Sequence, residues 1–235
     1  MQNQKTSIVF DEERAASYDQ GNAKFAPING VLHFLIRFVL SDLPADAQIL
    51  CVGVGTGLEL LYLAQAFPQW HFTAVEPSAP MLNICRQRAK ESGIESRCTF
   101  HEGYLDSLPA TNLFDAATCL FVSHFLLQRE DCCHLFSQIA SRLRPNGYLV
   151  NAALASDMST SAYQNLLEVW LRMQKYSGMS TEQVEQIPAV FGRDLAVLPL
   201  LEVESIIALS GFSTPVLFFQ TLLIYAWYAQ RTPLS

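Results

Sequence analysis

The feature that most constrains the fold is a glycine-rich segment, Gly53-Val54-Gly55-Thr56-Gly57, that lies between two apolar stretches. Before it, Gln48 to Val52 has the length and composition of a buried strand. After it, Leu58 to Phe67 carries leucines at helical spacing. Glycine permits the backbone conformations of a tight turn and lets a ligand approach the main chain closely. The sequence therefore predicts a strand, a tight turn and a helix in that order.

The same alternation of short strands and helices continues toward the C-terminus. We expect further strands at His71 to Val75, Cys98 to His101, Phe114 to Leu120 and Tyr148 to Ala152, and helices at Ser78 to Ser92 and Asp131 to Leu143. Pro145-Asn146-Gly147 is a turn signal between the last helix and the last of these strands. Such alternation predicts a parallel sheet with helices on both faces.

Both ends of the chain add further elements. We expect N-terminal helices within about 11–40, a helical cap insertion within about 157–198 that includes Tyr163 to Ala196, a helix at Glu202 to Ser210, and strands at Pro215 to Phe219 and Leu222 to Ala229. The short connection between the last two strands predicts an antiparallel hairpin. The expected architecture is one α/β domain over residues 1–235. It has a Rossmann-like, seven-stranded, mostly parallel sheet with an antiparallel C-terminal hairpin, N-terminal helices and a helical cap.

Composition restricts the classes of partner. Half of the 235 residues are hydrophobic, which is enough for a sizeable core, and the formal net charge of -7 disfavours a nucleic-acid partner. The six cysteines contain no CxxC pair and are expected to be buried, reduced thiols, and no metal site is expected. The N-terminus does not resemble a secretory signal, and no early apolar run is long enough to span a bilayer. We therefore expect a cytoplasmic protein that does not bind membranes, whose oligomeric state the sequence leaves open, with a homodimer as one option.

An acidic residue follows the second predicted strand at a meaningful distance from the glycines. Glu76 lies 19 positions after Gly57, where a carboxylate can accept hydrogen bonds from both hydroxyls of a ribose. The dinucleotide fingerprint GxGxxG would place its third glycine at position 58, but Leu58 stands there and the pattern is GxGxG. This spacing favours S-adenosylmethionine over a nicotinamide cofactor, which remains the disfavoured alternative.

Four motifs in order resemble those of class I S-adenosylmethionine-dependent methyltransferases. They are the glycine segment, Val75-Glu76-Pro77-Ser78, Phe114-Asp115-Ala116-Ala117 and Leu143-Arg144-Pro145-Asn146-Gly147. The resemblance covers roughly residues 11–230. Within that superfamily, His124-Phe125-Leu126, the helical insertion and Phe218-Phe219-Gln220 are similar to small bacterial methyltransferases and, more distantly, to carboxy-S-adenosylmethionine synthases.

The resemblance implies S-adenosylmethionine as cofactor and a set of residues that bind it. These are Tyr18, Gly53, Gly55, Gly57, Glu76, Pro77, Met81, Tyr104, Leu105 and Phe121. Two positions depart from the family pattern, because Cys51 and Tyr104 stand where members usually carry acids that help to hold the amino group and the adenine of the cofactor. Tyr104 could instead stack on or flank the adenine, and the Leu105 amide could reach the ring. Cys51 is expected to be a buried strand thiol.

His124 is the candidate for catalysis. It follows the fourth predicted strand, at the rim of the sheet where ligands of α/β folds bind, and a histidine there could act as general base or orient the acceptor. The alternative is a histidine that packs against or caps the next helix. The expected function is methyl transfer to an unidentified small-molecule acceptor. A protein that binds S-adenosylmethionine without methyltransferase activity, or with other chemistry on the cofactor, is the alternative.

Overall fold

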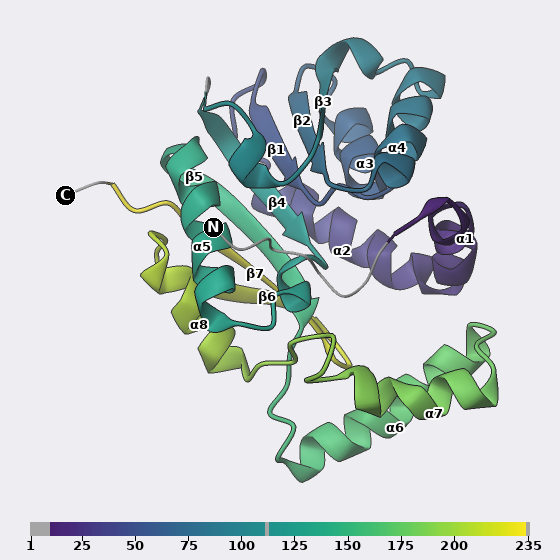
Figure 1. The fold of residues 1–235 in the computed structure, drawn as a ribbon. Helices are drawn as coiled ribbons and strands as arrows, with labels where there is room; N and C mark the ends of the chain where they lie inside the picture. The colour runs from purple at the N-terminus through teal and green to yellow at the C-terminus, as the bar shows by residue number, and fades with distance from the viewer. Residues whose placement is uncertain (1–9, 111–112, 234–235) are drawn as a thin grey trace.

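The computed structural model describes residues 10–110 and 113–233, whose centre is a seven-stranded sheet with the order β3-β2-β1-β4-β5-β7-β6 (Figure 1). The strands are β1 (Gln48–Val52), β2 (His71–Glu76), β3 (Cys98–Glu102), β4 (Phe114–Leu120), β5 (Leu143–Leu154), β6 (Val216–Thr221) and β7 (Ile224–Gln230). Strands β1 to β5 pair in parallel, whereas β7 pairs antiparallel with both β5 and β6. This arrangement confirms the predicted Rossmann-like sheet and its C-terminal hairpin.

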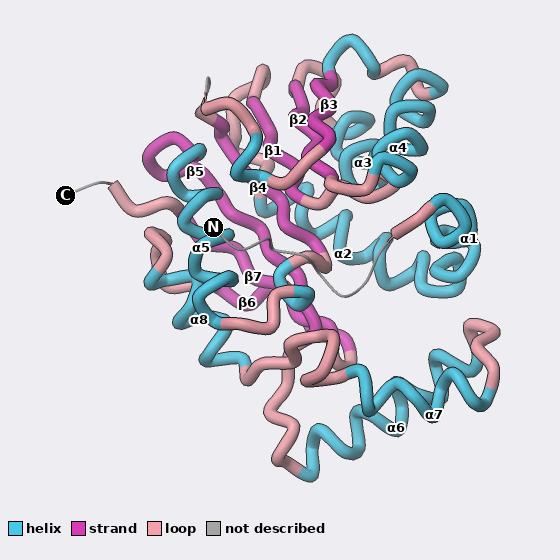
Figure 2. The backbone as a smooth tube through the Cα atoms, in the orientation of Figure 1, coloured by secondary structure: helices cyan, strands magenta, loops and turns pink. Residues whose placement is uncertain are grey.

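Helices cover both faces of the sheet (Figure 2). They are α1 (Glu12–Asn22), α2 (Ala26–Val39), α3 (Leu58–Ala66), α4 (Ala79–Glu91), α5 (Arg129–Arg142), α6 (Ser161–Tyr176), α7 (Thr181–Val190) and α8 (Leu200–Leu209). Helices α2, α3 and α4 contribute to one hydrophobic cluster, and α5 and α8 contribute to the other.

The side chains of β1 explain why both faces are covered. Ile49 and Cys51 belong to the cluster under α2, α3 and α4, whereas Leu50 and Val52 belong to the cluster under α5 and α8. Successive residues of a strand point to opposite faces, so a central strand buried on both sides is a continuous apolar run. Burial of these side chains fixes β1 in the middle of the sheet, with its C-terminal end at the glycine segment.

Helices α6 and α7 lie beyond the C-terminal ends of the parallel strands (Figure 1). A third cluster joins them to the sheet, with Tyr163, Leu167 and Trp170 of α6 packed with Leu154 and Ile224. Among the described residues, no helix combines the length and the apolar character needed to cross a membrane.

Two boundaries differ from the sequence-based expectation by five residues or more. Strand β5 begins at Leu143 rather than at Tyr148, because the expected turn is an irregularity within the strand where Asn146 has a positive φ of 62°. Helix α7 ends at Val190 instead of continuing to residue 196. Extended backbone at the next residue and a positive φ of 80° at Gly192 end the helix there.

Candidate functional site

The glycine segment is folded back onto β2. The backbone N–H groups of Gly53 and Val54 both donate to the carbonyl of Val75, at 2.8 and 3.1 Å. This contact brings the C-terminal ends of β1 and β2 together at one edge of the sheet. The predicted strand, turn and helix are therefore present, and the turn faces the edge where ligands of open α/β sheets bind.

The glycines of this segment serve different purposes. A β-carbon at Gly57, which has a φ of 86°, would lie 2.6 Å from the Cys85 sulfur, so this glycine allows α3 to pack closely on α4. Among the described residues, a β-carbon at Gly55 would have one neighbour within 4 Å, the methyl group of Met81 at 3.5 Å. Gly55 therefore leaves a space beside the main chain that is open to a ligand, and Gly57 does not.

Glu76 ends β2 and ties the turn to the next helix. Its two carboxylate oxygens accept hydrogen bonds from the N–H groups of Gly55, at 3.0 Å, and Ser78, at 2.9 Å. Burial raises the pKa of the Glu76 carboxyl, against the effect of these two donors. Each oxygen retains a further lone pair, so the carboxylate can still accept from a bound diol.

A cavity of about 150 Å³ opens between the strand ends and α1. Nine of the ten predicted cofactor-binding residues line it, namely Tyr18, Gly53, Gly55, Glu76, Pro77, Met81, Tyr104, Leu105 and Phe121. Gly57 is the exception. The wall also contains Phe125, which belongs to the His124-Phe125-Leu126 segment, and it contains Phe10 and Val122, which the sequence patterns did not single out because isolated apolar residues carry no motif.

Tyr104 and Leu105 form one end of this cavity. Tyr104 is 39% exposed, and Leu105 is buried at the start of a short 3-10 helix, Leu105–Ser107. The guanidinium of buried Arg142 donates to the carbonyls of Leu105, at 3.0 Å, and Leu108, at 3.2 Å. Arg142 therefore fixes the main chain of this wall from behind, a role that local sequence did not reveal.

Aromatic contacts hold the segment before α1 over the cavity. The ring of Phe10 packs edge-on against Tyr18, with centroids 5.8 Å apart, and against Phe125, with centroids 6.0 Å apart. The Ser78 hydroxyl donates to the Phe10 carbonyl at 2.6 Å. Tyr18 is thereby held in the wall of the cavity.

A second and larger cavity, of about 550 Å³, adjoins the first. The two share seven wall residues, which are Phe10, Tyr18, Gly53, Gly55, Leu120, Phe121 and Phe125. The larger cavity extends from the glycine segment past α1 and α2 to α6, where Trp170 and Gln174 line it. Phe121 has a positive φ of 60°, which is rare for an aromatic residue and holds its side chain where the cavities meet.

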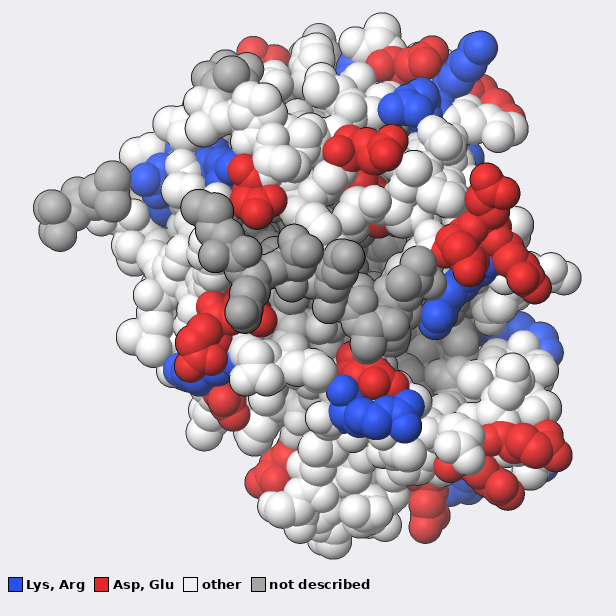
Figure 3. Space-filling view, viewed as in Figure 1, with Lys and Arg blue, Asp and Glu red and all other residues white. Residues whose placement is uncertain are grey.

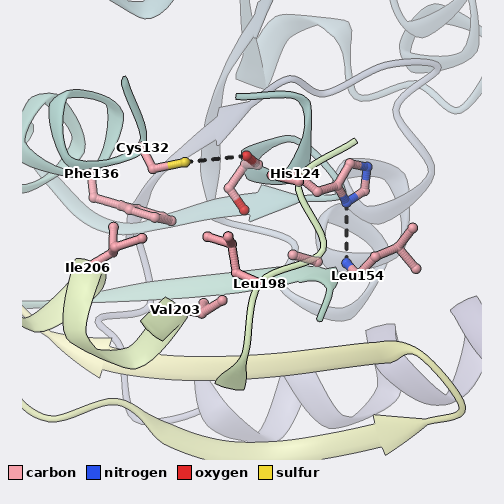
Figure 4. Close-up of a pocket in the computed structure, with 10 residues that line it drawn as sticks. His124, Cys132, Phe136, Leu154, Leu198, Val203 and Ile206 are labelled. Carbon is pink, nitrogen blue, oxygen red and sulfur yellow. Dashed lines mark hydrogen bonds between the residues drawn. The ribbon is translucent and has the colours of Figure 1, made fainter. Parts of the chain in front are cut away.

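His124 lines the larger cavity but not the smaller one. Its Nδ1 accepts a hydrogen bond from the N–H of Leu154 at 3.3 Å, and the other ring nitrogen points away from that bond (Figure 4). An accepting nitrogen carries no proton, so the neutral ring holds its proton on Nε2. Burial lowers the pKa of His124 to about 4. The ring is therefore suited to donate a hydrogen bond from Nε2, and this geometry does not favour the general-base role.

Other titratable groups in the same region are buried or half-buried. Burial lowers the pKa of His33 to about 4 and raises that of Glu59 to about 7. Both residues line the larger cavity. Cys51 is fully buried, and burial raises its pKa well above the ordinary value, so it remains a neutral thiol as expected.

Comparisons with known proteins agree with this geometry. Residues 49–147 match the family model of the methyltransferase domain. The chain is 23% identical over 191 residues to the carboxy-S-adenosyl-L-methionine synthase of Campylobacter jejuni, covering 78% of this chain and 77% of that protein. It is 33% identical over 104 residues to the fatty-acid O-methyltransferase of Mycolicibacterium smegmatis, covering 44% of this chain and 35% of that one.

The fold is also found among solved structures. A candidate O-methyltransferase from Nostoc punctiforme superposes with a TM-score of 0.69 at 17% identity, over 96% of this chain and 63% of that one.

The chain spans 24% of the length of an uncharacterised Synechococcus protein, to which it is 35% identical over 103 residues. Residues 49–147 are therefore similar to the methyltransferase domain family, and the chain shares the fold of the Nostoc structure.

Proposed function

We propose that this protein transfers a methyl group from S-adenosylmethionine to a small, largely apolar acceptor. When bound, the cofactor supplies a methyl group made electrophilic by its sulfonium. The observation that carries the proposal is the shared wall of the two cavities, in which Gly53, Gly55 and Phe121 belong to both. Two ligands that meet at such a wall can be aligned for direct transfer, and alignment is the main requirement of this reaction.

The smaller cavity suits the cofactor because its donors and acceptors match the parts of that molecule. Gly55 leaves the main chain accessible to the methionine part, and Glu76 offers oxygens to the ribose hydroxyls. Tyr104 and Leu105 would flank the adenine, and Tyr18 would cover it from α1. Gly57 supports this site through helix packing rather than through contact.

The larger cavity suits an acceptor with little charge. Its wall carries apolar side chains such as Phe25, Trp170 and Ile224 and neutral polar groups such as Asn29 and Gln174, and its charged residues, Arg14 and Glu59, are of opposite sign. The relative that is a fatty-acid O-methyltransferase supports an apolar acceptor. On the face shown in Figure 3, acidic and basic side chains are interspersed. This face therefore offers no broad positively charged surface for a polyanion. Helices α6 and α7 would act as the cap on the acceptor side.

His124 would orient the acceptor. With Nδ1 engaged by the Leu154 amide, Nε2 is left to donate a hydrogen bond to an oxygen or nitrogen of the acceptor. The proton released on methylation of a hydroxyl would then pass to solvent or to another group. His124 is therefore proposed as a positioning residue rather than as the base.

The proposal is tested in two stages. Calorimetry with S-adenosylhomocysteine measures whether the cofactor site exists, and cofactor labelled in its methyl group is then incubated with fractionated metabolite extracts. Labelled product in an apolar fraction would support the function and identify the acceptor. Tight binding without product in any fraction would favour the alternative, in which the protein binds the cofactor but does not transfer its methyl group. Absence of binding would overturn both.

A further inference from the structure

Glu59 is a buried carboxylate that faces a cavity. It occupies the first turn of α3, directly after the glycine segment, and is 8% exposed. It lines the larger cavity and not the smaller one, next to Gly53 and Gly55, which line both cavities and over which the methionine part of the cofactor would lie. Among the residues that the structure describes, those lining the two cavities include two carboxylates, Glu59 and Glu76.

No cation of the described residues neutralises Glu59. None of the ion pairs among residues 10–110 and 113–233 includes it, and the charged group that acts on it most is another carboxylate, Glu76. The backbone N–H groups of Glu59 itself and Leu60 partly offset the effect of burial on its pKa. Arg14 lines the same cavity, but its guanidinium lies over the ring of Phe10, 5.0 Å from the centroid.

A buried carboxylate without a counter-ion is costly unless a ligand supplies the positive charge. Building on the proposed function, we propose that Glu59 binds the α-ammonium of the methionine part of the cofactor. It would thereby supply the negative charge that the neutral thiol of Cys51 lacks.

Neighbouring groups explain why this role goes to Glu59. Glu76 has both oxygens engaged by the N–H groups of Gly55 and Ser78 and is assigned to the ribose. Cys51 lies close enough for Glu59 to raise its pKa, in addition to the effect of burial, so the thiol cannot carry the charge. Glu59 therefore brings a carboxylate from α3 to the region next to the end of β1.

The assignment makes cofactor affinity depend on pH in a defined direction. Burial raises the pKa of Glu59 to about 7, so below that pH the free protein holds the carboxyl protonated. The ammonium of the cofactor binds the ionised form of the Glu59 carboxyl. The affinity for the cofactor must therefore rise with pH until Glu59 of the free protein is ionised. The titratable groups that face Glu59 electrostatically are Tyr18 of α1, Cys51 of β1, Glu76 of β2, Cys85 of α4 and Cys119 of β4.

Two ligands that differ only in the α-amino group isolate the contribution of the ammonium to binding affinity. Calorimetry compares S-adenosylhomocysteine with its desamino analogue, in which hydrogen replaces the α-amino group, so any effect of Glu76 on the ribose cancels in the ratio of the two affinities. At pH 8 we expect Glu59→Gln to weaken S-adenosylhomocysteine at least tenfold, as loss of a charged hydrogen bond does, and to leave the analogue within about twofold. Glu182→Gln, which removes an exposed carboxylate from the first turn of α7, should change neither.

Wild-type protein provides a test that needs no substitution. The affinity ratio of the two ligands should rise about tenfold between pH 6 and pH 8, as the ionised fraction of a group with a pKa near 7 does. Glu59→Gln should abolish this dependence. A ratio that is independent of pH in wild type, or unchanged by Glu59→Gln, would overturn the assignment and leave Glu59 as a helix-stabilising residue. Failure of wild type to bind either ligand would instead overturn the proposed function.

Discussion

The Asp19 carboxylate of α1 accepts a hydrogen bond from the hydroxyl of Thr56 in the glycine segment, at 2.9 Å. Its second oxygen contacts the guanidinium of Arg88 in α4 at 2.5 Å. Tyr18, the preceding residue, lines the smaller cavity, to which we assign the cofactor in our proposal. The Asp19 carboxylate therefore connects α1 to the glycine segment and to α4. These two contacts hold α1, which carries Tyr18, against the glycine segment.

Asp19→Ala should loosen the contact of α1 with the glycine segment. Loss of one hydrogen bond and of a partly exposed ion pair is worth roughly 1 to 2 kcal/mol, so S-adenosylhomocysteine should bind about 5- to 30-fold more weakly. The loss should come mainly from faster dissociation, which stopped-flow measurements would detect. Glu12→Ala, on the exposed part of α1, is the control. A dissociation rate equal to that of wild type would show that α1 does not retain the cofactor.

Glu76→Ala should reduce affinity for S-adenosylhomocysteine by at least about tenfold, because a charged acceptor is lost. The substitution also frees the Gly55 N–H that this carboxylate holds, so Glu76→Gln, which retains one oxygen acceptor, is the better test of the ribose contact. We expect Glu76→Gln to keep most of the thermal stability of the wild type and to bind S-adenosylhomocysteine more weakly than the wild type does. If calorimetry finds that Glu76→Gln binds with wild-type affinity, Glu76 does not bind the ribose.

Gly55→Val should yield a folded protein that does not bind cofactor, since a side chain there would occupy the open space beside the main chain. The substitution also strains a backbone with a φ of 56°. Gly93→Val provides a matched control, because Gly93 has a φ of 70° and an added β-carbon would have no neighbour within 4 Å. Circular dichroism and calorimetry on both variants separate strain from blockage. Equal affinity in the two variants would mean that Gly55 is only a turn residue.

His124→Gln should lower methyl transfer about 3- to 10-fold, the effect of one neutral hydrogen bond, rather than by the roughly 10² to 10⁴ of a lost general base. Because the pKa of His124 is lowered to about 4, the wild-type rate should show no inflection from this residue between pH 6 and 7. Once an acceptor is known, pH–rate profiles of wild type, His124→Gln and the exposed control His134→Gln would test this. An inflection near pH 6.5 that only His124→Gln abolishes would restore the general-base role.

The cofactor region was largely predictable. Gly55 and Glu76 belong to segments in which glycine spacing and strand order are read directly from the sequence, and both line the smaller cavity of the structure. The role of Gly57 differed, because its contact with Cys85 in α4 depends on how two helices pack. His124 follows β4 as its sequence position indicated, but the partner of its Nδ1 is Leu154, 30 residues away.

The sequence by itself determined the order of the elements, because turn chemistry and hydrophobic periodicity act between residues close in the chain. It also determined the GxGxG turn and the acid that follows the second strand. Only the tertiary structure decided which groups are charged or neutral within the site. Glu59 and His124 titrate far from their ordinary values because folding removes water from them, and burial is set by contacts between distant segments. For the same physical reason, the junction of the two cavities belongs to the folded chain and to no single motif.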